Sequence, residues 1–385
     1  MRRDKMYAWK IPGTVVSGEH AIEQLPFLCA EAKKIAVFSD HSIEAAGVLE
    51  HPLALLRQAG LETVCLLDLY PEPTYKQAQA VVDAFQSSGA DRIVAIGGGS
   101  VMDIAKLCSI AADGRYTIKD LLDDPSRGKK TVKTVMIPTT AGTGAEATPN
   151  AIVAVPEKEL KVGIVCAEMI PDAVILDGEM IRRLPPAIAA STGVDALCHA
   201  IECYTSRKAT PFSDLFAQEA LKLIFPHIER ACLDPDAIES KNAMLLAAFY
   251  AGAAITCSGT TAVHALSYPL GGKYHIAHGT ANAMLLVPVM RFNASACQED
   301  FARMYDFLEE RDAQTNEEKS VWVLTRLEEM VKHLNIPTDL TSFGVTAKDV
   351  DSLVSAAMDV QRLLQNNKRP VTPEDARQIY QQLLA

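Results

Sequence analysis

The stretch DRIVAIGGGSVMDIAKLCSIAAD (residues 91–113) joins a strand to a helix through three consecutive glycines. Its first part is apolar and rich in β-branched residues, which predicts a buried strand over 91–100 that ends in the glycines. Its second part predicts a helix over 101–113. The same alternation surrounds it, with strands expected at 33–40 and 62–69, a strand that runs into a Gly/Thr loop over 133–144, and helical segments expected up to Gln58 and over 75–87. Strands separated by helices of this length predict βαβ units and a parallel sheet with right-handed crossovers.

The paired prolines Pro185-Pro186 mark a change of character along the chain. Before them, residues 152–157 and 161–166 suit a hairpin, and residues 173–177 suit a strand that closes the sheet. After them, helical periodicity dominates to Ala385 and few strand-like runs occur. A chain of 385 residues is also long for a single core. We therefore expect an α/β domain over 1–184 and an all-helical domain over 185–385.

Composition narrows the classes of protein and partner. Hydrophobic residues make up 49% of the chain, and its net charge of −11 comes without a long run of Lys or Arg. Nucleic acid and anionic membranes are therefore poor partners, since both bind clustered basic surfaces. The nine scattered cysteines contain no C-x-x-C pair, which favours reduced thiols. With no signal-peptide pattern and no apolar run of membrane-spanning length, we expect a soluble, cytoplasmic protein.

The glycine turn Gly97-Gly98-Gly99-Ser100 is a candidate phosphate site. Glycines let the backbone approach a phosphate closely, and the following helix directs free N–H groups and its positive end at the anion. Asp103 and Lys106 follow on the first turns of that helix. The sequence lacks the G-x-G-x-x-G fingerprint, so an ordinary strand-to-helix turn is the competing interpretation.

Further candidates for binding a dinucleotide follow other predicted strands. Asp40 ends the strand at 33–40, where a carboxylate can bind ribose hydroxyls and would repel a 2′-phosphate, which favours NAD over NADP. An ordinary helix N-cap is the alternative role for Asp40. The loop PTTAGTG (138–144) could line the nicotinamide ribose and the pyrophosphate. Lys161 is a nearby cation that could reach a ribose or a phosphate, although most single lysines are merely solvated.

The helical half contains a candidate metal site. Asp195 and His199 stand four apart within TGVDALCHAIECY (192–204), a spacing that places both side chains on one face of a helix. His264 and His278 belong to later helical runs. One carboxylate and three imidazoles suit a divalent ion such as Fe, Zn, Mn or Ni, with an open position left for a substrate. The competing interpretation is that Asp-x-x-x-His arises by chance and that the histidines are hydrogen-bonded core residues.

Several sequence blocks resemble the iron-containing (group III) alcohol dehydrogenase family. The blocks are GGGSVMDIAK, PTTAGTGAEATP, LPPAIAASTGVDALCHAIECYTS and VHALSYPLGGKYHIAHGTANAMLL, and the resemblance runs in order through nearly the whole chain. It implies a dehydroquinate synthase-like fold, in which a dinucleotide-binding α/β domain precedes a helical metal-binding domain. It implies that Asp195, His199, His264 and His278 bind the metal, usually Fe²⁺ and sometimes Zn²⁺ or another divalent ion. The dinucleotide positions then fall on Asp40, Gly97, Gly98, Gly99, Ser100, Thr139, Thr140, Thr143, Thr148 and Lys161, with Asp103 beside them.

The sequence departs from the family pattern next to the metal ligands. The block that commonly reads H-A-x-x-H has Tyr268 as its last residue, so the usual histidine of the proton relay is missing. A tyrosine hydroxyl within reach could serve, although its ordinary pKa near 10 makes it a weaker base at neutral pH. His275 is the other candidate for the relay, and its alternative is a loop or pocket-lining residue. Two further departures are smaller. Ala277 precedes His278, and Glu72 stands where Asn is frequent in the family; neither removes a predicted metal ligand.

The resemblance implies hydride transfer between NAD(H) and a small primary alcohol or aldehyde, in a homodimer or larger homo-oligomer. One alternative is the glycerol-dehydrogenase or dehydroquinate-synthase branch, which acts on a polyol or a cyclic phosphate. A phosphate would require several basic residues near the metal, and only Lys273 and Arg291 are obvious candidates. A catalytically silent nucleotide-binding or scaffold protein is a different class, which the intact set of four ligands disfavours. The exact substrate, the metal, the oligomeric state, the physiological direction and the group that relays the proton stay open.

Overall fold

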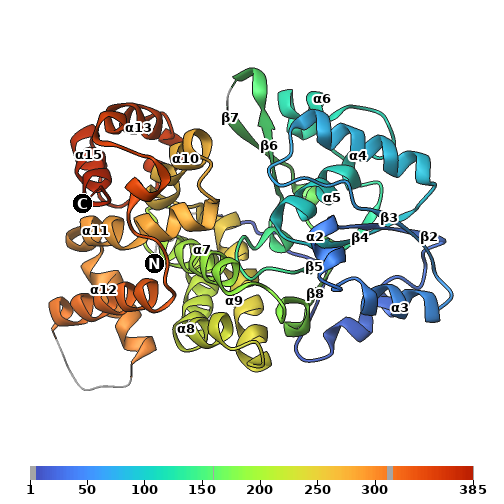
Figure 1. The fold of residues 1–385 in the computed structure, drawn as a ribbon, viewed down its shortest axis with the longest axis horizontal. Coiled ribbons are helices and arrows are strands. Elements are labelled where there is room, and N and C mark those ends of the chain that lie inside the picture. Colours follow the sequence, from blue (N-terminus) through green and yellow to red (C-terminus); the bar gives the residue numbers. More distant parts are fainter. Residues whose placement is uncertain (1–5, 159, 310–314, 385) are drawn as a thin grey trace. The chain divides into compact units, whose positions relative to one another are not determined.

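The computed structural model describes residues 6–158, 160–309 and 315–384, and Figure 1 shows its fold. These residues form two compact units. The first unit consists of Lys10–Leu184 together with Pro235–Phe249. The second unit holds the described residues of Met1–Trp9, Pro185–Asp234 and Tyr250–Ala385.

The first unit is built on a parallel sheet with the strand order β1-β8-β5-β4-β2-β3. This confirms the fold class expected from the alternation of strands and helices. Strands β4 and β5 pair in register up to Gly97 and Pro138, so the glycine turn and the loop after Pro138 leave the sheet at the same edge. The strands are β1 (Thr14–Ser17), β2 (Lys34–Phe38), β3 (Glu62–Leu66), β4 (Arg92–Gly97), β5 (Lys133–Pro138) and β8 (Ala173–Leu176).

One edge of the sheet differs from the sequence expectation. Strand β8 does not close the sheet but lies between β5 and β1, and β1 forms the edge. We did not predict β1 as a strand. It has only four residues and is exposed at most of them, so it lacks the apolar run that identifies a buried strand.

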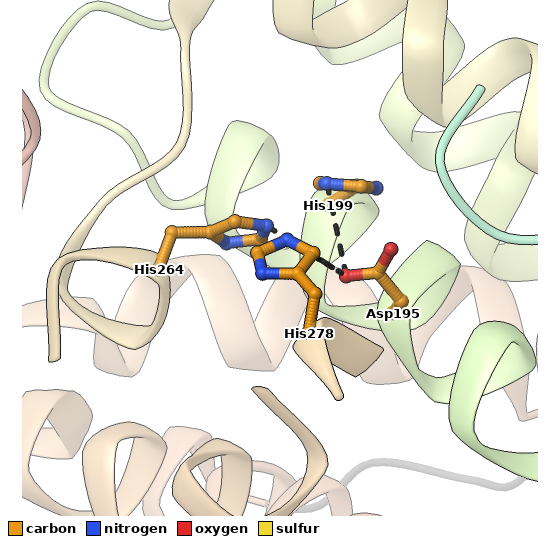
Figure 2. A group of neighbouring side chains, drawn as sticks. All are labelled: Asp195, His199, His264 and His278. Carbon is orange, nitrogen blue, oxygen red and sulfur yellow. Dashed lines mark ion pairs between the residues drawn. The ribbon is translucent and has the colours of Figure 1, made fainter. Parts of the chain in front are cut away.

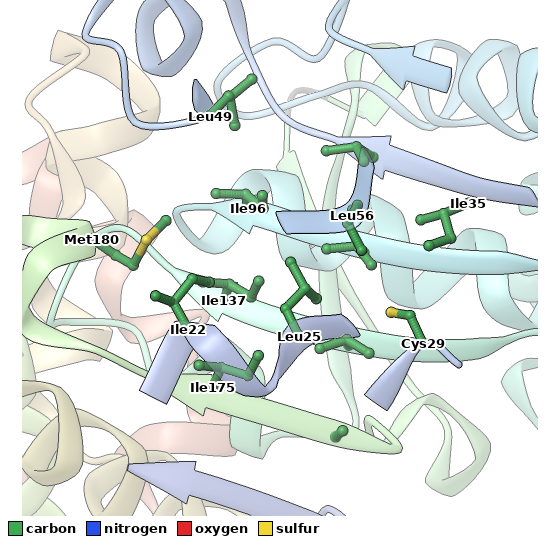
Figure 3. Close-up of a cluster of buried hydrophobic side chains, with 14 of the residues drawn as sticks. Ile22, Leu25, Cys29, Ile35, Leu49, Leu56, Ile96, Ile137, Ile175 and Met180 are labelled. Carbon is green, nitrogen blue, oxygen red and sulfur yellow. The ribbon is translucent and has the colours of Figure 1, made fainter. Parts of the chain in front are cut away.

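Helices cover both faces of the sheet, because successive side chains of a strand point to opposite sides. On one face, Ile35, Val37 and Ile96 pack against Leu25 and Leu56 from the covering helices (Figure 3). On the other face, Phe38 contacts Phe85 with ring centroids 6.1 Å apart. The helices are η1 (Ala21–Gln24), α1 (Leu25–Leu28), α2 (His41–Ala45), α3 (Glu50–Gln58), α4 (Tyr75–Ser88), α5 (Gly99–Ala111) and α6 (Ile118–Asp123), with short 3₁₀ turns η2 (Pro125–Arg127), η3 (Ala145–Ala147), η4 (Pro156–Lys158), η5 (Ala167–Met169) and η6 (Gly178–Ile181).

The expected hairpin is present beside this sheet. Strands β6 (Asn150–Val155) and β7 (Leu160–Val165) pair antiparallel and form a separate two-stranded sheet. Strand β6 contacts α4 and α5, and Ala154 N–H donates to the carbonyl of Pro73. The hairpin therefore lies against α5, the helix that follows the glycine turn, and against α4, the helix before it.

The second unit is helical, as the periodicity after the paired prolines predicted. Its helices α8 and α15 begin with capping boxes at Thr210 and Thr372, in which a threonine and the residue three positions later satisfy each other's backbone amides. Helix α9 starts in the first unit and ends in the second. The elements are α7 (Pro186–Tyr204), α8 (Pro211–Leu233), α9 (Ile238–Ser258), α10 (Ala262–Tyr274), α11 (His278–Leu308), α12 (Asn316–His333), η7 (Leu340–Phe343), η8 (Ala347–Asp349), α13 (Val350–Met358), α14 (Gln361–Leu364) and α15 (Pro373–Gln382).

Two short segments depart from a simple division of the chain at residue 184. The described residues of Met1–Trp9 belong to the second unit, and Pro235–Phe249 belongs to the first. Trp9 packs on Phe212 and Phe216 of α8, with ring centroids 5.8 and 4.6 Å away. Asn242 of α9 accepts a 2.6 Å hydrogen bond from the Gly178 N–H. These contacts join segments that are distant in sequence, so hydropathy along the chain does not reveal them. The assignment of 1–184 and 185–385 as functional domains stays a proposal.

Neither a single membrane-spanning helix nor a disulfide occurs among the described residues. No helix alone has the length and hydropathy of a membrane span; α9 and α10 reach these only when taken together, and they meet at an angle of 104°. None of the nine cysteines, all of them among the described residues, forms a disulfide. Cys198 and Cys203 are buried within α7, as expected of small apolar side chains.

Glu146 in η3 generates a prediction about stability. Burial raises the pKa of this carboxyl from 4.5 to about 7, and its Oε1 has no hydrogen-bond partner. The unfolded chain releases the proton near pH 4.5, whereas the folded chain keeps it until about pH 7. The free energy of unfolding should therefore fall as the pH rises through this window, by at most about 3 kcal/mol.

In Glu146→Gln this loss should be absent. Urea unfolding of the variant and the natural protein across the window should give curves that diverge with rising pH, with the variant becoming relatively more stable. The exposed Glu62→Gln is the control and should follow the natural protein. Parallel curves for Glu146→Gln and the natural protein would contradict the prediction.

Candidate metal centre and nucleotide-binding loops

Four side chains from three helices converge at one point of the second unit. Asp195 and His199 come from consecutive turns of α7, His264 comes from α10, and His278 is the first residue of α11. One ligand atom from each lies within 4.8 Å of the others (Figure 2). The structure thus brings together all four residues predicted to bind metal.

The distances within this cluster suit a common ion. Asp195 Oδ1 lies 3.9 Å from His199 Nε2 and 3.8 Å from the Nε2 atoms of His264 and His278. Ligand atoms held about 2 Å from one ion would stand roughly 3–4 Å apart. One carboxylate oxygen and three imidazole nitrogens form a donor set that divalent transition metals bind. The residues therefore fit a divalent ion.

The cluster is buried on every side but one. The side chains of Asp195, His199 and His264 are at most 7% exposed, whereas that of His278 is 40% exposed. Access from solvent therefore runs past His278. This asymmetry gives a bound ion an enclosed side and an open side.

The protonation states of two ligands favour metal binding at neutral pH. Burial alone would raise the pKa of Asp195, but the three surrounding histidines and Asn282 hold it below its usual range. Burial lowers the pKa of His199 to about 4. The carboxylate is therefore charged and the imidazole of His199 is neutral, which are the forms that bind a cation.

Glu202 orients the imidazole of His264 through its Nδ1 atom. The sequence patterns did not predict this residue. It lies on α7, one turn after His199, and its side chain is fully buried. Its Oε2 contacts His264 Nδ1, which places the proton on Nδ1 and leaves Nε2 free to face the other ligands. Despite the burial of both groups, this contact keeps the pKa of Glu202 lowered and that of His264 raised.

The second oxygen of Glu202 caps a helix. Oε1 accepts hydrogen bonds from the N–H groups of Thr261 and Val263, at 3.0 and 2.8 Å, and from the Thr261 hydroxyl at 2.7 Å. These amides belong to the first turn of α10, where a helix has no internal acceptors. One carboxylate therefore fixes both the start of α10 and the imidazole that this turn carries. The spacing of Asp195, His199 and Glu202 on one helix face is the signal that could have revealed it.

Asn282 and Gly279 bring α11 close to these ligands. The Asn282 amide nitrogen lies 2.7 Å from Asp195 Oδ1 and 3.1 and 3.2 Å from Nε2 of His264 and His278. A β-carbon at Gly279 would lie 2.5 Å from the carbonyl oxygen of Ser191 in α7. Only glycine permits this approach of α11 to α7, which places His278 opposite Asp195.

The glycine turn of the first unit has the form expected of a phosphate site. Gly97 ends β4, and Gly98 caps α5 without any side chain accepting from the helix amides. A β-carbon at Gly97 would lie 2.6 Å from the Val101 side chain, and one at Gly99 would lie 3.0 Å from that of Thr143. Side chains are thus excluded where the first amides of α5 face outward. Binding of a diphosphate here, with Ser100, stays a prediction.

Asp103 and Lys106 have internal partners in the structure. Lys106 is fully buried and donates to Asp103 Oδ1 at 2.9 Å, to the Ala145 carbonyl at 2.9 Å and to the Thr148 hydroxyl at 3.2 Å. The other oxygen of Asp103 accepts from the Ile152 N–H at 2.9 Å. This network fastens the threonine-rich loop and β6 to α5. It gives Asp103 and Thr148 a supporting role, and their contact with a nucleotide stays untested.

The helix-cap alternative for Asp40 is present. Its Oδ1 accepts from the N–H groups of Ser42 and Ile43 at 2.8 and 3.0 Å, which caps α2. These bonds use one carboxylate oxygen, and Asp40 is half-buried at the end of β2. The cap and the predicted ribose contact are therefore compatible. The loop that carries Thr139, Thr140 and Thr143 follows β5, the neighbour of β4.

Lys161 and Glu72 pair beside the glycine turn. Their charged atoms lie 2.5 Å apart, and the Glu72 N–H donates to Ser100 Oγ at 3.2 Å. Glu72 has a φ of 52°, a left-handed conformation that Asn adopts more readily. Glu72, in place of the Asn that is frequent in the family, thus adds backbone strain. It also supplies a carboxylate that binds Lys161.

The two candidates for the proton relay have different surroundings. Tyr268 lies one turn after His264 on α10, and its ring centroid is 6.1 Å from that of His278. Burial raises the pKa of the Tyr268 hydroxyl, and the Arg362 guanidinium within hydrogen-bonding reach opposes this rise. His275 instead ends α10 in a left-handed conformation with a φ of 54°, and its side chain is exposed. The geometry favours Tyr268.

The basic residues singled out in the sequence are engaged elsewhere. Lys273 pairs with Asp349 at 3.1 Å, and Arg291 pairs with Glu328 at 2.5 Å. Arg362, on α14, is the cation that lies near Tyr268, and sequence reasoning missed it. It stands far from the ligands along the chain, so no local motif indicates its position.

Glu202 gives a prediction about metal affinity. Glu202→Gln should keep an oxygen for the α10 amides but weaken the acceptor for His264 Nδ1–H. Metal affinity should fall about 10- to 100-fold, as found when the partners of metal-ligating histidines are removed. Competition with a chelator of known affinity measures this change. Glu219→Gln on the exposed part of α8 is the control, and equal affinities in both variants would contradict the role of Glu202.

Known proteins match the chain over nearly its whole length. Residues 12–178 match the family described as iron-containing alcohol dehydrogenase, and residues 189–384 match the C-terminal part of the Fe-containing alcohol dehydrogenase family. The NAD-dependent methanol dehydrogenase of Bacillus methanolicus is 32% identical, with 97% of this chain and 99% of that protein covered. The lactaldehyde reductase of Escherichia coli (strain K12) is 33% identical over 90% and 91% of the two chains. The crystal structure of a 1,3-propanediol oxidoreductase superposes with a TM-score of 0.91 at 28% identity, covering 99% of this chain and 100% of that one. The chain belongs to the iron-containing alcohol dehydrogenase family.

Proposed function

We propose that the protein interconverts small primary alcohols and their aldehydes with NAD(H) at a divalent metal centre. Family membership makes the protein an oxidoreductase that acts on alcohols and aldehydes. The observation that supports a metal-dependent reaction most strongly is the convergence of Asp195, His199, His264 and His278. The size of the substrate and the identity of the metal belong to the proposal.

Each part of the cluster has a task in this proposal. Asp195, His199 and His264 hold the ion from the buried side, and His278 completes the set next to solvent. A divalent ion bound there supplies Lewis acidity, which lowers the pKa of an alcohol toward neutrality. We propose Fe²⁺ as this ion, with Zn²⁺ or another divalent ion as the alternative. Glu202 keeps His264 in the tautomer that binds.

We propose that the glycine turn and the threonine-rich loop hold the dinucleotide. The amides at the start of α5, which no side chain caps, would bind the diphosphate. Asp40 would accept hydrogen bonds from the ribose hydroxyls through the carboxylate oxygen that does not cap α2. Thr139, Thr140, Thr143 and Lys161 complete the proposed site.

We propose Tyr268 as the group that exchanges a proton with the alcohol oxygen. It adjoins His278, the ligand on the exposed side, whereas His275 serves as the cap of α10. The pKa of Tyr268 is raised by burial, so the hydroxyl keeps its proton at neutral pH. This suits a donor in aldehyde reduction, and alcohol oxidation would then depend on a small fraction of tyrosinate.

The setting of the enzyme is also a proposal. We infer a cytoplasmic homodimer or larger homo-oligomer, with no nucleic-acid or membrane partner. The lack of disulfides among the described cysteines and a net charge of −11 support this inference.

Removal of a metal ligand gives the first test of the function. His264→Ala should lose bound metal and the formation of NADH from small primary alcohols, since three ligands hold an ion far less well than four. Elemental analysis and NADH absorbance on the same preparation measure both properties. His278→Ala should likewise lose bound metal and activity. Because His278 is partly exposed, its replacement disturbs folding less, so this variant separates metal loss from misfolding. His51→Ala on the surface is the control; full activity of a metal-free variant would overturn the proposal.

A second test concerns the dinucleotide. Asp40→Asn should retain the cap of α2, because an amide oxygen also accepts from Ser42 and Ile43. Loss of the charge should raise the ratio of kcat/KM for NADP to that for NAD about tenfold, which corresponds to a repulsion on the order of 1 kcal/mol. Asp83→Asn on the exposed face of α4 is the control. An unchanged ratio would remove Asp40 from the ribose site.

A further inference from the structure

Arg362 is a cation beside the exposed side of the candidate metal centre. It lies on α14, which packs against α10, the helix that carries His264 and Tyr268. Leu363 and Leu364 of α14 are buried, whereas Arg362 is exposed. The Asn366 side chain donates to the Thr260 carbonyl at 2.9 Å, which ties the end of α14 to the start of α10. The backbone segment that carries Arg362 is therefore held against α10.

Arg362 differs from the other basic residues of this unit in its partners. No carboxylate among residues 6–158, 160–309 and 315–384 lies within ion-pair distance of it, in contrast to Lys273 and Arg291. Its guanidinium lies within hydrogen-bonding reach of the Tyr268 hydroxyl. A guanidinium has five N–H donors, so a bond to one hydroxyl leaves a pair of parallel donors for a carboxylate or a sulfonate.

Tyr268 connects this cation to the metal centre. Its ring centroid lies 6.1 Å from that of His278, and it is 41% exposed. His278 is the only one of the four ligands with substantial exposure in its side chain. His278, Tyr268 and Arg362 thus form a continuous solvent-facing row that starts at the metal ligands.

Arg362 is a positive charge at the exposed side of the candidate centre. The carboxylates of Asp195 and Glu202 are enclosed, with side chains at most 2% exposed. An anionic group that approaches from the exposed side, at His278, finds the guanidinium there. A substrate with an anionic group would gain a charge-assisted bidentate contact there, whereas a neutral alcohol would not.

We propose that Arg362 is a specificity-determining residue that binds an anionic group of the substrate, so that the preferred substrates are alcohols or aldehydes that carry a carboxylate or sulfonate a few atoms from the reacting carbon. This inference rests on the proposed alcohol dehydrogenase function and names its substrate class. The hydroxyl or carbonyl end lies at the metal ligands, and the anionic end lies at the guanidinium beyond Tyr268.

The test compares matched substrates on the metal-loaded holoenzyme. ω-Hydroxycarboxylates, from glycolate upward in chain length, are paired with neutral primary alcohols of the same length. The natural protein should show a higher kcat/KM for the anionic member at the length that spans the row. In Arg362→Gln the ratio of kcat/KM for anionic to neutral substrates should fall on the order of 10- to 100-fold, mainly through KM. Arg362→Lys, which keeps the charge without the fork, should recover part of this ratio.

Control variants and measurements show whether Arg362 acts on the substrate or on the cofactor. Arg291→Gln removes an exposed arginine of the same unit and should leave the ratio as it is in the natural protein. Metal content and KM for NAD are measured in every variant. A rise in KM for NAD in Arg362→Gln, with an unchanged substrate ratio, would assign the guanidinium to a phosphate of the cofactor and overturn the proposal. An equal preference for neutral and anionic substrates in the natural protein would also overturn it, while leaving the alcohol dehydrogenase function intact. Absence of turnover with every alcohol would instead reject the proposed function.

Discussion

The contact between the buried Glu202 carboxylate and the His264 imidazole is the interaction on which the metal centre depends. A charged carboxylate without partners is costly to bury, and Glu202 offsets this cost with one imidazole and three hydrogen bonds from the start of α10. One oxygen of this carboxylate determines where α10 begins, and the other determines which nitrogen of His264 faces the other ligands. Because Glu202 and Asp195 share α7, the position of one helix determines most of the ligand geometry.

The first unit uses the same device at its nucleotide loops. Lys106 is a buried cation whose bonds reach Asp103, the Ala145 carbonyl and Thr148, and together they hold the threonine-rich loop against α5. In each unit a buried ionic residue on a helix joins a loop that comes from elsewhere in the chain. Loops that must present backbone amides or ligand atoms cannot be held by apolar packing alone, since their own polar groups need partners. Buried charges with directional bonds meet this need.

Sequence reasoning reached the parallel sheet and the pairing of Asp195 with His199 because both depend on local patterns, whereas the resemblance to a known family added His264 and His278 to the ligand set. The alternation around residues 91–113 gave the sheet, and the spacing of Asp195 and His199 gave one helix face. It missed β1, whose four residues are mostly exposed, and Arg362, which stands far along the chain from the residues it adjoins. Such features depend on tertiary contacts, which no periodicity records. The helix-face spacing did contain the signal for Glu202, three residues after His199, but a carboxylate at that position also fits an exposed face.

The division between buried and exposed parts of the centre explains how one metal site can serve different substrates. Asp195, His199 and His264 are enclosed, and Glu202 holds His264, so a substitution among them would disturb how an ion is held. Tyr268 and Arg362 stand at the exposed side, and neither is a ligand or a partner of a ligand nitrogen. Changes there alter what approaches the ion without altering how the ion is held. On the proposed role of Arg362, the tyrosine and the guanidinium select the substrate at this side while the set of metal ligands stays unchanged.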